Sequence, residues 1–267
     1  MQESGGGGEG DEYWEKYLTF TFSSNGTIGI NHGSSSPNVT VFYKKNDSAW
    51  VQYTLGTMLT VNSGDVIKWK GNNPQYASST LTNYKNNFSG SASFEAYGNI
   101  MSLTNGDDFK TASALTANYT FTALFSASSV TSVENLVLPA ETITINCYTR
   151  MFQACTSLTT PMEVLPSMSL AKQCYLQMFM NCSNLTAAPT LPSTTVTDGG
   201  YQQMFYGCSR LNYVKCLALT LATSTSTNYW LHNVASSGTF VKNANKTDWS
   251  RDASGIPANW TVQNATS

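Results

Sequence analysis

The sequence predicts a β-rich chain of the α+β class: an N-terminal antiparallel β-sandwich, a short repeat solenoid and a C-terminal β cap. Before residue 105, short runs of β-branched and aromatic residues recur every 8 to 12 residues, which is typical of a sandwich. A frame of 26 to 27 residues then recurs through the second half, and such a period predicts units that stack on their neighbours. The predicted boundaries are 1–12 for a leader, 13–108 for the sandwich, 109–216 for the repeats and 217–267 for the cap.

Residues 1–12 form an acidic, glycine-rich leader. This composition predicts a flexible segment, either a tether or an end without a role. The leader lacks the basic and apolar regions of a signal peptide. Two origins stay open: a mature chain without its export signal, or a chain made in the cytosol and assembled into a particle.

The sandwich begins with an alternating run at residues 17–22, which places Leu18, Phe20 and Phe22 on one face. Asn25-Gly26 is a hairpin turn that leads into a second strand. Further strands are predicted at residues 39–43, 50–54, 58–61, 66–70 and 91–103. The looser stretch 71–90 is interpreted as a binding loop or, preferably, as a long solvated connection.

The repeats share the frame Phe-x-x-Cys-x-x-Leu, and each Phe follows a Met. A Leu-Pro pair comes 13 or 14 residues after the Phe in two copies, and a degenerate unit around Phe125 precedes the clear ones. Equivalent residues of stacked units face one core, so the frame residues are predicted to be structural. These residues are Phe152, Cys155, Leu158, Phe179, Cys182, Leu185, Phe205, Cys208 and Leu211.

Within one unit, apolar residues at 170, 174, 178 and 182 predict one face of a short helix, with Ser169 as its N-cap. Proline tends to end a strand, so Pro166 and Pro192 are predicted to end one strand per coil. Each coil is then helix, turn, strand and turn. The stacked strands are expected to form a parallel sheet, whose outward columns come from residues 159–164, 186–190 and 212–215.

Five of the six cysteines fall in two phases of the repeat, Cys147 and Cys174 in one and Cys155, Cys182 and Cys208 in the other. This pattern favours free, buried thiols that pack as small apolar groups. Disulfides and metal binding are the alternatives. The spacing of a zinc site is absent, and the histidines are His32 and His232. No cofactor is predicted.

The repeat of 26 to 27 residues is not continued in the C-terminal segment, residues 217–267. At the position 26 residues after Met204 the chain has Trp230-Leu231, and residues 238–242 and 255–262 are predicted strands of a cap. An array needs such an atypical end to cover its last apolar face.

The frame Met-Phe-x-x-Cys-x-x-Leu, followed by Leu-Pro and then by Cys-Tyr at residues 147–148 and 174–175, resembles the BspA-like, treponemal-type leucine-rich repeats. These occur in surface proteins of Bacteroidetes and in some of their phages. The resemblance covers roughly residues 120–262. It implies a leucine-rich-repeat solenoid and a role in adhesion, and it implies no catalytic residue.

Several function classes are disfavoured. Charged residues are 11% of the chain and the net charge is −2, so a basic surface for nucleic acid is missing. No apolar run approaches the roughly 18 residues of a membrane span. Common catalytic motifs are absent. Asp107-Asp108 is either half of an acidic site or, preferably, a solvated turn.

A group of aromatic residues has two interpretations. Trp50, Tyr53, Trp69 and Tyr76 could form a platform for sugars, but core packing is preferred because both tryptophans lie in apolar strands.

The sequence therefore favours a non-enzymatic recognition or adhesion protein at a bacterial surface. Its expected partner is a protein or glycan on a host or neighbouring cell. The alternative is a fibre or decoration protein of a phage virion that contacts other virion proteins, and a carbohydrate-binding module is the third possibility.

Overall fold

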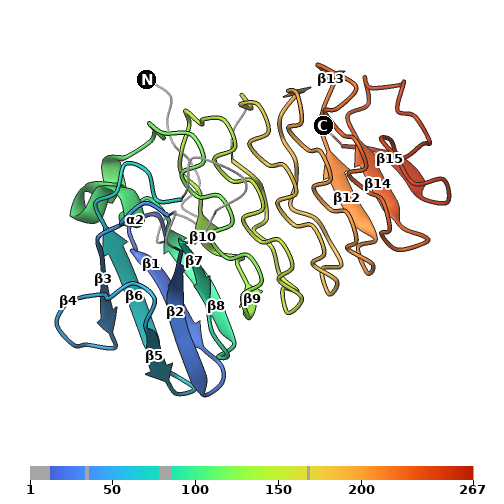
Figure 1. Ribbon diagram of the computed structural model, residues 1–267. Coiled ribbons are helices and arrows are strands. Elements are labelled where there is room, and N and C mark those ends of the chain that lie inside the picture. Colours follow the sequence, from blue (N-terminus) through green and yellow to red (C-terminus); the bar gives the residue numbers. More distant parts are fainter. Residues whose placement is uncertain (1–12, 34–35, 78–85, 167–168, 267) are drawn as a thin grey trace.

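The computed structural model describes residues 13–33, 36–77, 86–166 and 169–266, and strands at its N-terminal end lead into a row of coils (Figure 1). The predicted leader and residues 78–85 of the predicted loop lie outside these ranges. The elements are β1 Leu18–Phe22, β2 Gly26–His32, β3 Val41–Lys45, β4 Val51–Gln52, β5 Met58–Val61, β6 Val66–Gly71, β7 Asn86–Ser89, β8 Phe94–Asn99, α2 Ser102–Asn105, η1 Gly106–Thr111, β9 Val130–Ser132, β10 Leu136–Val137, β11 Thr195–Val196, β12 Tyr213–Cys216, β13 Thr220–Leu221, β14 Thr239–Lys242 and β15 Thr261–Asn264.

The N-terminal strands form two facing sheets. One has the order β10-β8-β1-β6-β3-β4, with β9 also paired to β8, and the other has the order β5-β2-β7. Phe20 of β1 lies 4.7 Å from Phe88 of β7, and Trp69 of β6 lies 5.0 Å from the same ring (centroid distances). All three side chains are fully buried, because alternate residues of a strand point to the same face. The arrangement is sandwich-like.

The first coil continues both the sheet and the core of this N-terminal part. Its strands β9 and β10 pair with β8 in parallel. The ring of Phe125 stacks on Phe88 at 5.7 Å, and one cluster of buried residues runs through both parts. The division of the chain at residue 108 stays a prediction, and the two parts share extensive contacts.

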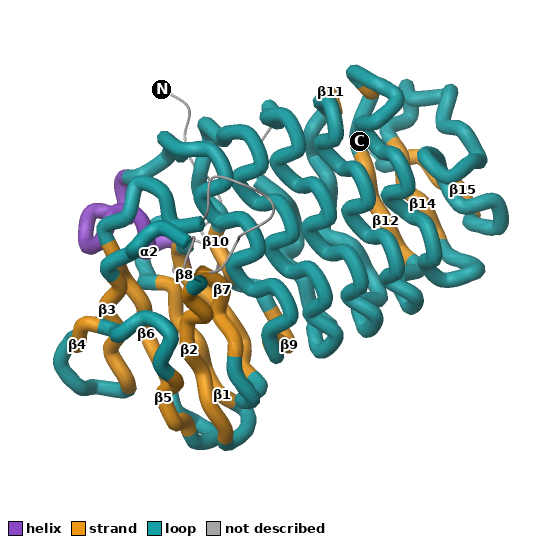
Figure 2. The backbone as a smooth tube through the Cα atoms, viewed as in Figure 1, coloured by secondary structure: helices purple, strands orange, loops and turns teal. Residues whose placement is uncertain are grey.

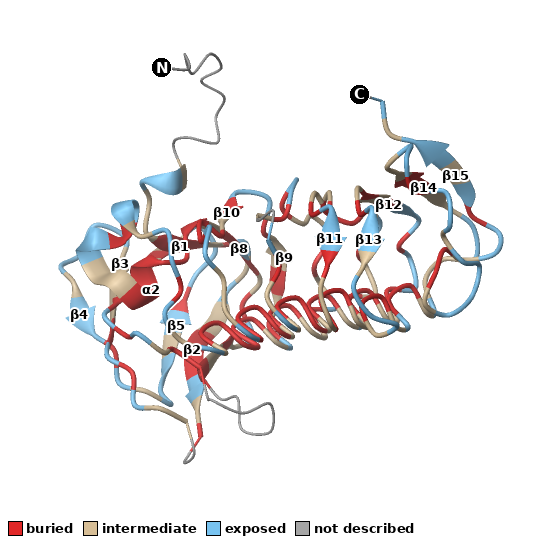
Figure 3. Ribbon diagram, turned by 90° about the horizontal axis from the view of Figure 1, so that it is seen from above, coloured by how far each residue is buried: buried red, intermediate tan, exposed pale blue. Residues whose placement is uncertain are grey.

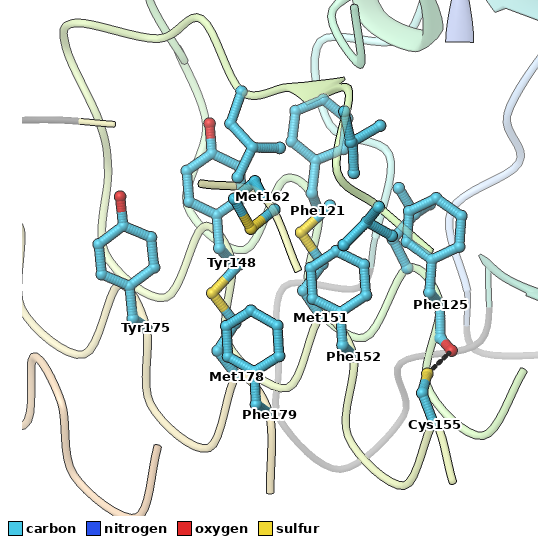
Figure 4. Close-up of a cluster of buried hydrophobic side chains, with 14 of the residues drawn as sticks. Phe121, Phe125, Tyr148, Met151, Phe152, Cys155, Met162, Tyr175, Met178 and Phe179 are labelled. Atoms are coloured by element: carbon cyan, nitrogen blue, oxygen red, sulfur yellow. Dashed lines mark hydrogen bonds between the residues drawn. The ribbon is translucent and has the colours of Figure 1, made fainter. Parts of the chain in front are cut away.

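Two columns of stacked rings run through the coils. One joins Phe88, Phe125, Phe152, Phe179 and Phe205, with neighbouring centroids 5.2 to 5.7 Å apart. The other joins Phe121, Tyr148, Tyr175, Tyr201, Trp230 and Trp249 at 5.4 to 6.3 Å. Figure 4 shows the first coils, with Met151 and Met178 between the two columns. Trp230 occupies the position of a Met in the frame, yet its ring continues the tyrosine column.

The segment that holds the Met-Phe pair has an unusual backbone. Residues at every fourth position have positive φ, between 51° and 74°; they include Ala123, Arg150, Gln177 and Gln203. Alternate N–H groups bond to the carbonyl three residues earlier, as from Leu124 to Phe121. The N–H groups between them bond to the next coil. These inter-coil bonds all run from the earlier to the later coil, as from Phe152 to Met178.

The predicted leucine-rich-repeat solenoid and the α+β class are wrong. Among the described residues, helix is found at Tyr13 and Trp14, in α2 and in the 3₁₀ helix η1, and none of these lies in the repeats. An α-helix needs every N–H to bond four residues back within its own segment. Here alternate backbone N–H groups donate to carbonyls of the neighbouring coil. The helix expected at residues 170–182, with Ser169 as its cap, therefore does not form.

The strand expected in each coil is also reduced. Between the second and third coils the pairing is one bridge, Val164 with Thr190. Figure 2 shows that most of the stacked coils are loop and turn. The correct description is a β-rich chain with several open sheets: a sandwich-like pair, then turn-rich coils, then the parallel sheet β12-β14-β15. We call the segments with positive φ at every fourth residue the turn side; Figure 3 shows them as a row of short spirals along one long side.

Candidate binding surfaces

The predicted frame residues lie in the core. All nine, from Phe152 to Leu211, have no solvent-exposed surface. The three frame cysteines each donate the thiol proton to the carbonyl of the Phe one coil earlier, at 2.9 to 3.0 Å from Sγ. These residues build the stack and are not available to a ligand.

All six cysteines are free and buried, in agreement with the prediction. Burial raises the pKa of Cys155 and of Cys208 to about 12. A thiol with such a pKa stays protonated at neutral pH, and the thiolate is the nucleophile and the metal ligand. Within the described ranges no group of three or more His, Cys, Asp or Glu side chains could hold a metal ion.

The acidic pair at residues 107–108 does not form a carboxylate site. Asp107 accepts hydrogen bonds from Lys70 at 2.8 Å and from the hydroxyl of Tyr17 at 2.6 Å. These bonds lower the pKa of Asp107, while burial and this contact raise the pKa of Tyr17 to about 12. Asp107 therefore ties η1 to the sheet through β6 and the residue before β1.

The proposed platform of Trp50, Tyr53, Trp69 and Tyr76 is mostly core. Tyr53, Trp69 and Tyr76 are buried, as preferred from the sequence. Trp50 is half-buried, and the ammonium of Lys70 lies 4.6 Å from its ring centroid. Lys70 therefore lies over the ring of Trp50, the one residue of this group that is not buried.

The predicted outward columns expose few large side chains. Val164 is 47% exposed and Tyr213 is 39% exposed, whereas Met162 and Val214 of the same segments are buried. Glu163 is exposed beside Val164. The columns are therefore mixed and not a uniform binding face.

A row of amides was missed by sequence reasoning because this segment was assigned to a helix. Arg150 Nε donates to Gln177 Oε1 at 2.5 Å, and Gln177 Nε2 donates to Gln203 Oε1 at 2.6 Å. The three residues come from successive coils at the same position of the repeat. We call them the amide row; it runs along the turn side.

The amide row ends beside three aromatic residues, Tyr206, Tyr229 and His232, which we call the aromatic platform. His232 stacks on Tyr206 at 5.2 Å and meets Tyr229 edge-on at 5.5 Å. Tyr229 is 43% exposed, and the other two rings are partly exposed. The spacing of 26 residues between Tyr206 and His232 could have revealed the stack, since it equals the repeat.

The platform has free polar groups. No hydrogen bond in the described structure uses the hydroxyls of Tyr206 and Tyr229 or the ring nitrogens of His232. The side-chain amide nitrogen of Gln203 is equally free. His32, the other histidine, contacts Asn86 in the sandwich-like part at 3.0 Å.

No protein-family model, curated protein or solved structure matches the chain. The resemblance to BspA-like proteins therefore stays an expectation. None of the helices in the described ranges has the length and apolar character that crossing a bilayer requires.

Proposed function

We propose that this chain is a non-catalytic recognition protein that binds a glycan chain through its turn side. The observation that carries the proposal is the aromatic platform at the end of the amide row. Ligand sites combine apolar rings with a few polar groups that fix orientation. The three rings offer flat apolar surface, and their polar atoms, with Gln203, offer hydrogen bonds.

The composition of the amide row and the aromatic platform favours an uncharged ligand. Apart from Arg150, the residues of the row and the platform are amides, tyrosines and a histidine. Binding through such groups depends little on ionic strength, because salt screens charge–charge interactions. A role in adhesion at a bacterial surface is part of this proposal and rests on the resemblance of the repeats.

A glycan array at 50 and 300 mM salt identifies the ligand, and calorimetry on the best glycan then compares three proteins. Tyr229→Ala with His232→Ala is expected to weaken binding at least tenfold, because the stacking surface is removed. Tyr213→Ala is the matched control, since Tyr213 has similar exposure but lies on β12. It is expected to bind like the unchanged chain.

Three results would contradict the proposal. They are equal binding by the platform variant, loss of binding at 300 mM salt, and turnover of the bound glycan. Circular dichroism of each variant excludes loss of fold as the cause of weaker binding.

A further inference from the structure

A groove runs between the first and second coils, apart from the turn side. It consists of two adjoining hollows of about 470 and 340 Å³ that share Leu138 and Pro166. Trp14 lines the first hollow and Val164 the second. Both side chains are among the exposed large apolar residues, at 36% and 47%.

The two coils are not hydrogen-bonded along this groove. They pair at its beginning, where Val133 N–H donates to the carbonyl of Thr160 at 2.8 Å. Beyond this point the described structure has no backbone bond between residues 134–140 and residues 161–166. The groove thus lies where two neighbouring chain segments stop pairing.

Each segment keeps an open backbone edge toward the groove. The carbonyls of residues 135 and 137 accept hydrogen bonds from the N–H groups of Gly98, in β8, and of Ile100, which follows β8. In an extended chain the intervening residues point the other way. The N–H of Leu136 bonds back to the carbonyl of Val133 at 3.1 Å, and the N–H of Leu138 has no backbone partner in the described ranges.

The same holds on the opposite wall of the groove. The carbonyl of Glu163 and the N–H of Leu165 are bonded to Thr190. Val164, which lies between them, has no backbone hydrogen bond among the described residues. Its N–H and carbonyl therefore point toward the first coil and are open to an added strand.

The rim of the groove is acidic. Glu134 and Glu163 border one hollow and Glu141 borders the other, and all three are exposed. None of them takes part in an ion pair within the described structure. A ligand with positive charges would pair with these carboxylates, and a negative ligand would be repelled.

We propose that this groove binds an extended peptide segment of a partner protein, with aliphatic side chains alternating with Lys or Arg. The peptide adds as a strand to an open backbone edge. Its aliphatic side chains cover Val164 and Trp14, and its cations meet the glutamates. This site is separate from the aromatic platform and does not depend on glycan binding.

The test uses a fluorescently labelled, capped octapeptide of alternating valine and lysine, with binding to the whole chain followed by anisotropy. We expect saturable binding that weakens at 300 mM salt. The counterpart peptide with glutamate in place of lysine is expected not to bind. Combining Glu134→Gln, Glu141→Gln and Glu163→Gln should weaken binding of the lysine peptide at least tenfold, because the carboxylates that pair with its ammonium groups are removed. These three side chains are exposed, so the substitutions keep the fold.

The backbone contribution is tested with a valine–lysine peptide that is N-methylated at alternate residues on one edge, and with its isomer methylated on the other edge. One of the two is expected to lose binding. Equal binding of both methylated isomers, equal binding of the lysine and glutamate peptides, or no binding at 1 mM would each overturn the proposal. Tyr229→Ala with His232→Ala should leave peptide binding unchanged, so failure here is distinguishable from failure of the glycan proposal.

Discussion

Replacing Phe179 with alanine removes one ring from the middle of the phenylalanine column. Phe179 is fully buried, 5.2 Å from Phe152 and 5.6 Å from Phe205. Burial of the side chain contributes roughly 1.5–3 kcal/mol, and each ring pair adds about 0.5–1.5 kcal/mol. Together these give roughly 2.5–6 kcal/mol, and Phe→Ala changes in cores typically cost about 3–5 kcal/mol. We expect a loss of about 4 kcal/mol.

The measurement is urea unfolding followed by far-ultraviolet circular dichroism and by tryptophan fluorescence. Phe179→Leu keeps most of the apolar volume and loses the ring pairs, so its free energy of unfolding should fall by roughly 1–3 kcal/mol. Tyr229→Ala, an exposed change, should stay within about 0.5 kcal/mol of the unchanged chain. A loss below about 1 kcal/mol for Phe179→Ala would refute the reasoning, because the column would then carry little of the stability.

Three further predictions concern the thiols, the response to acid and the boundary near residue 108. A thiol reagent at pH 8 should label almost no cysteine in the folded chain and six after denaturation, since all six are free and buried; a count near zero after denaturation would mean disulfides. The pKa of Asp65 is lowered to about 2 by hydrogen bonds from the Asn62 N–H, Lys45 and Asn46, so the stability that it contributes is complete above about pH 4 and is lost as the pH falls toward 2. Asp65→Asn should flatten the fall of the urea midpoint over this range, and an unchanged slope would contradict that assignment. Limited proteolysis should spare residues 105–110, because Asp107 is bonded to Lys70 and Tyr17; early cutting there into two folded fragments would instead support separable parts.

The sequence predicted the buried residues of the repeats correctly, but it predicted the wrong backbone conformation for them. The period of the Phe-x-x-Cys-x-x-Leu frame shows which side chains share a phase, and residues of one phase stack whatever the local conformation. Cys174, Met178 and Cys182 are fully buried at spacings of four, as predicted for one face of a helix. A chain of turns that repeats every four residues produces the same spacing, so burial periodicity could not separate the two.

The conformation depends on bonds that sequence periodicity does not reveal. Positive φ is uncommon for residues other than glycine, yet Ala154 and Gln177 adopt it here. Hydrogen bonds to the neighbouring coil compensate for this local cost, and they form only once the coils are stacked. The aromatic platform was overlooked for the same reason, because a helix would have placed Tyr206 and Tyr229 differently.

The uniform direction of the inter-coil hydrogen bonds gives the stack an electrical polarity. Every such bond on the turn side has its N–H in the earlier coil and its carbonyl in the later one, as from Phe205 to Trp230. Peptide dipoles aligned in this way add, as they do in a helix. The partial positive end therefore lies at the last coil, where the N–H groups of Tyr229 and Leu231 donate to no backbone carbonyl in the described ranges. A chain of low net charge thus carries a fixed field along its length, with the aromatic platform at its positive end.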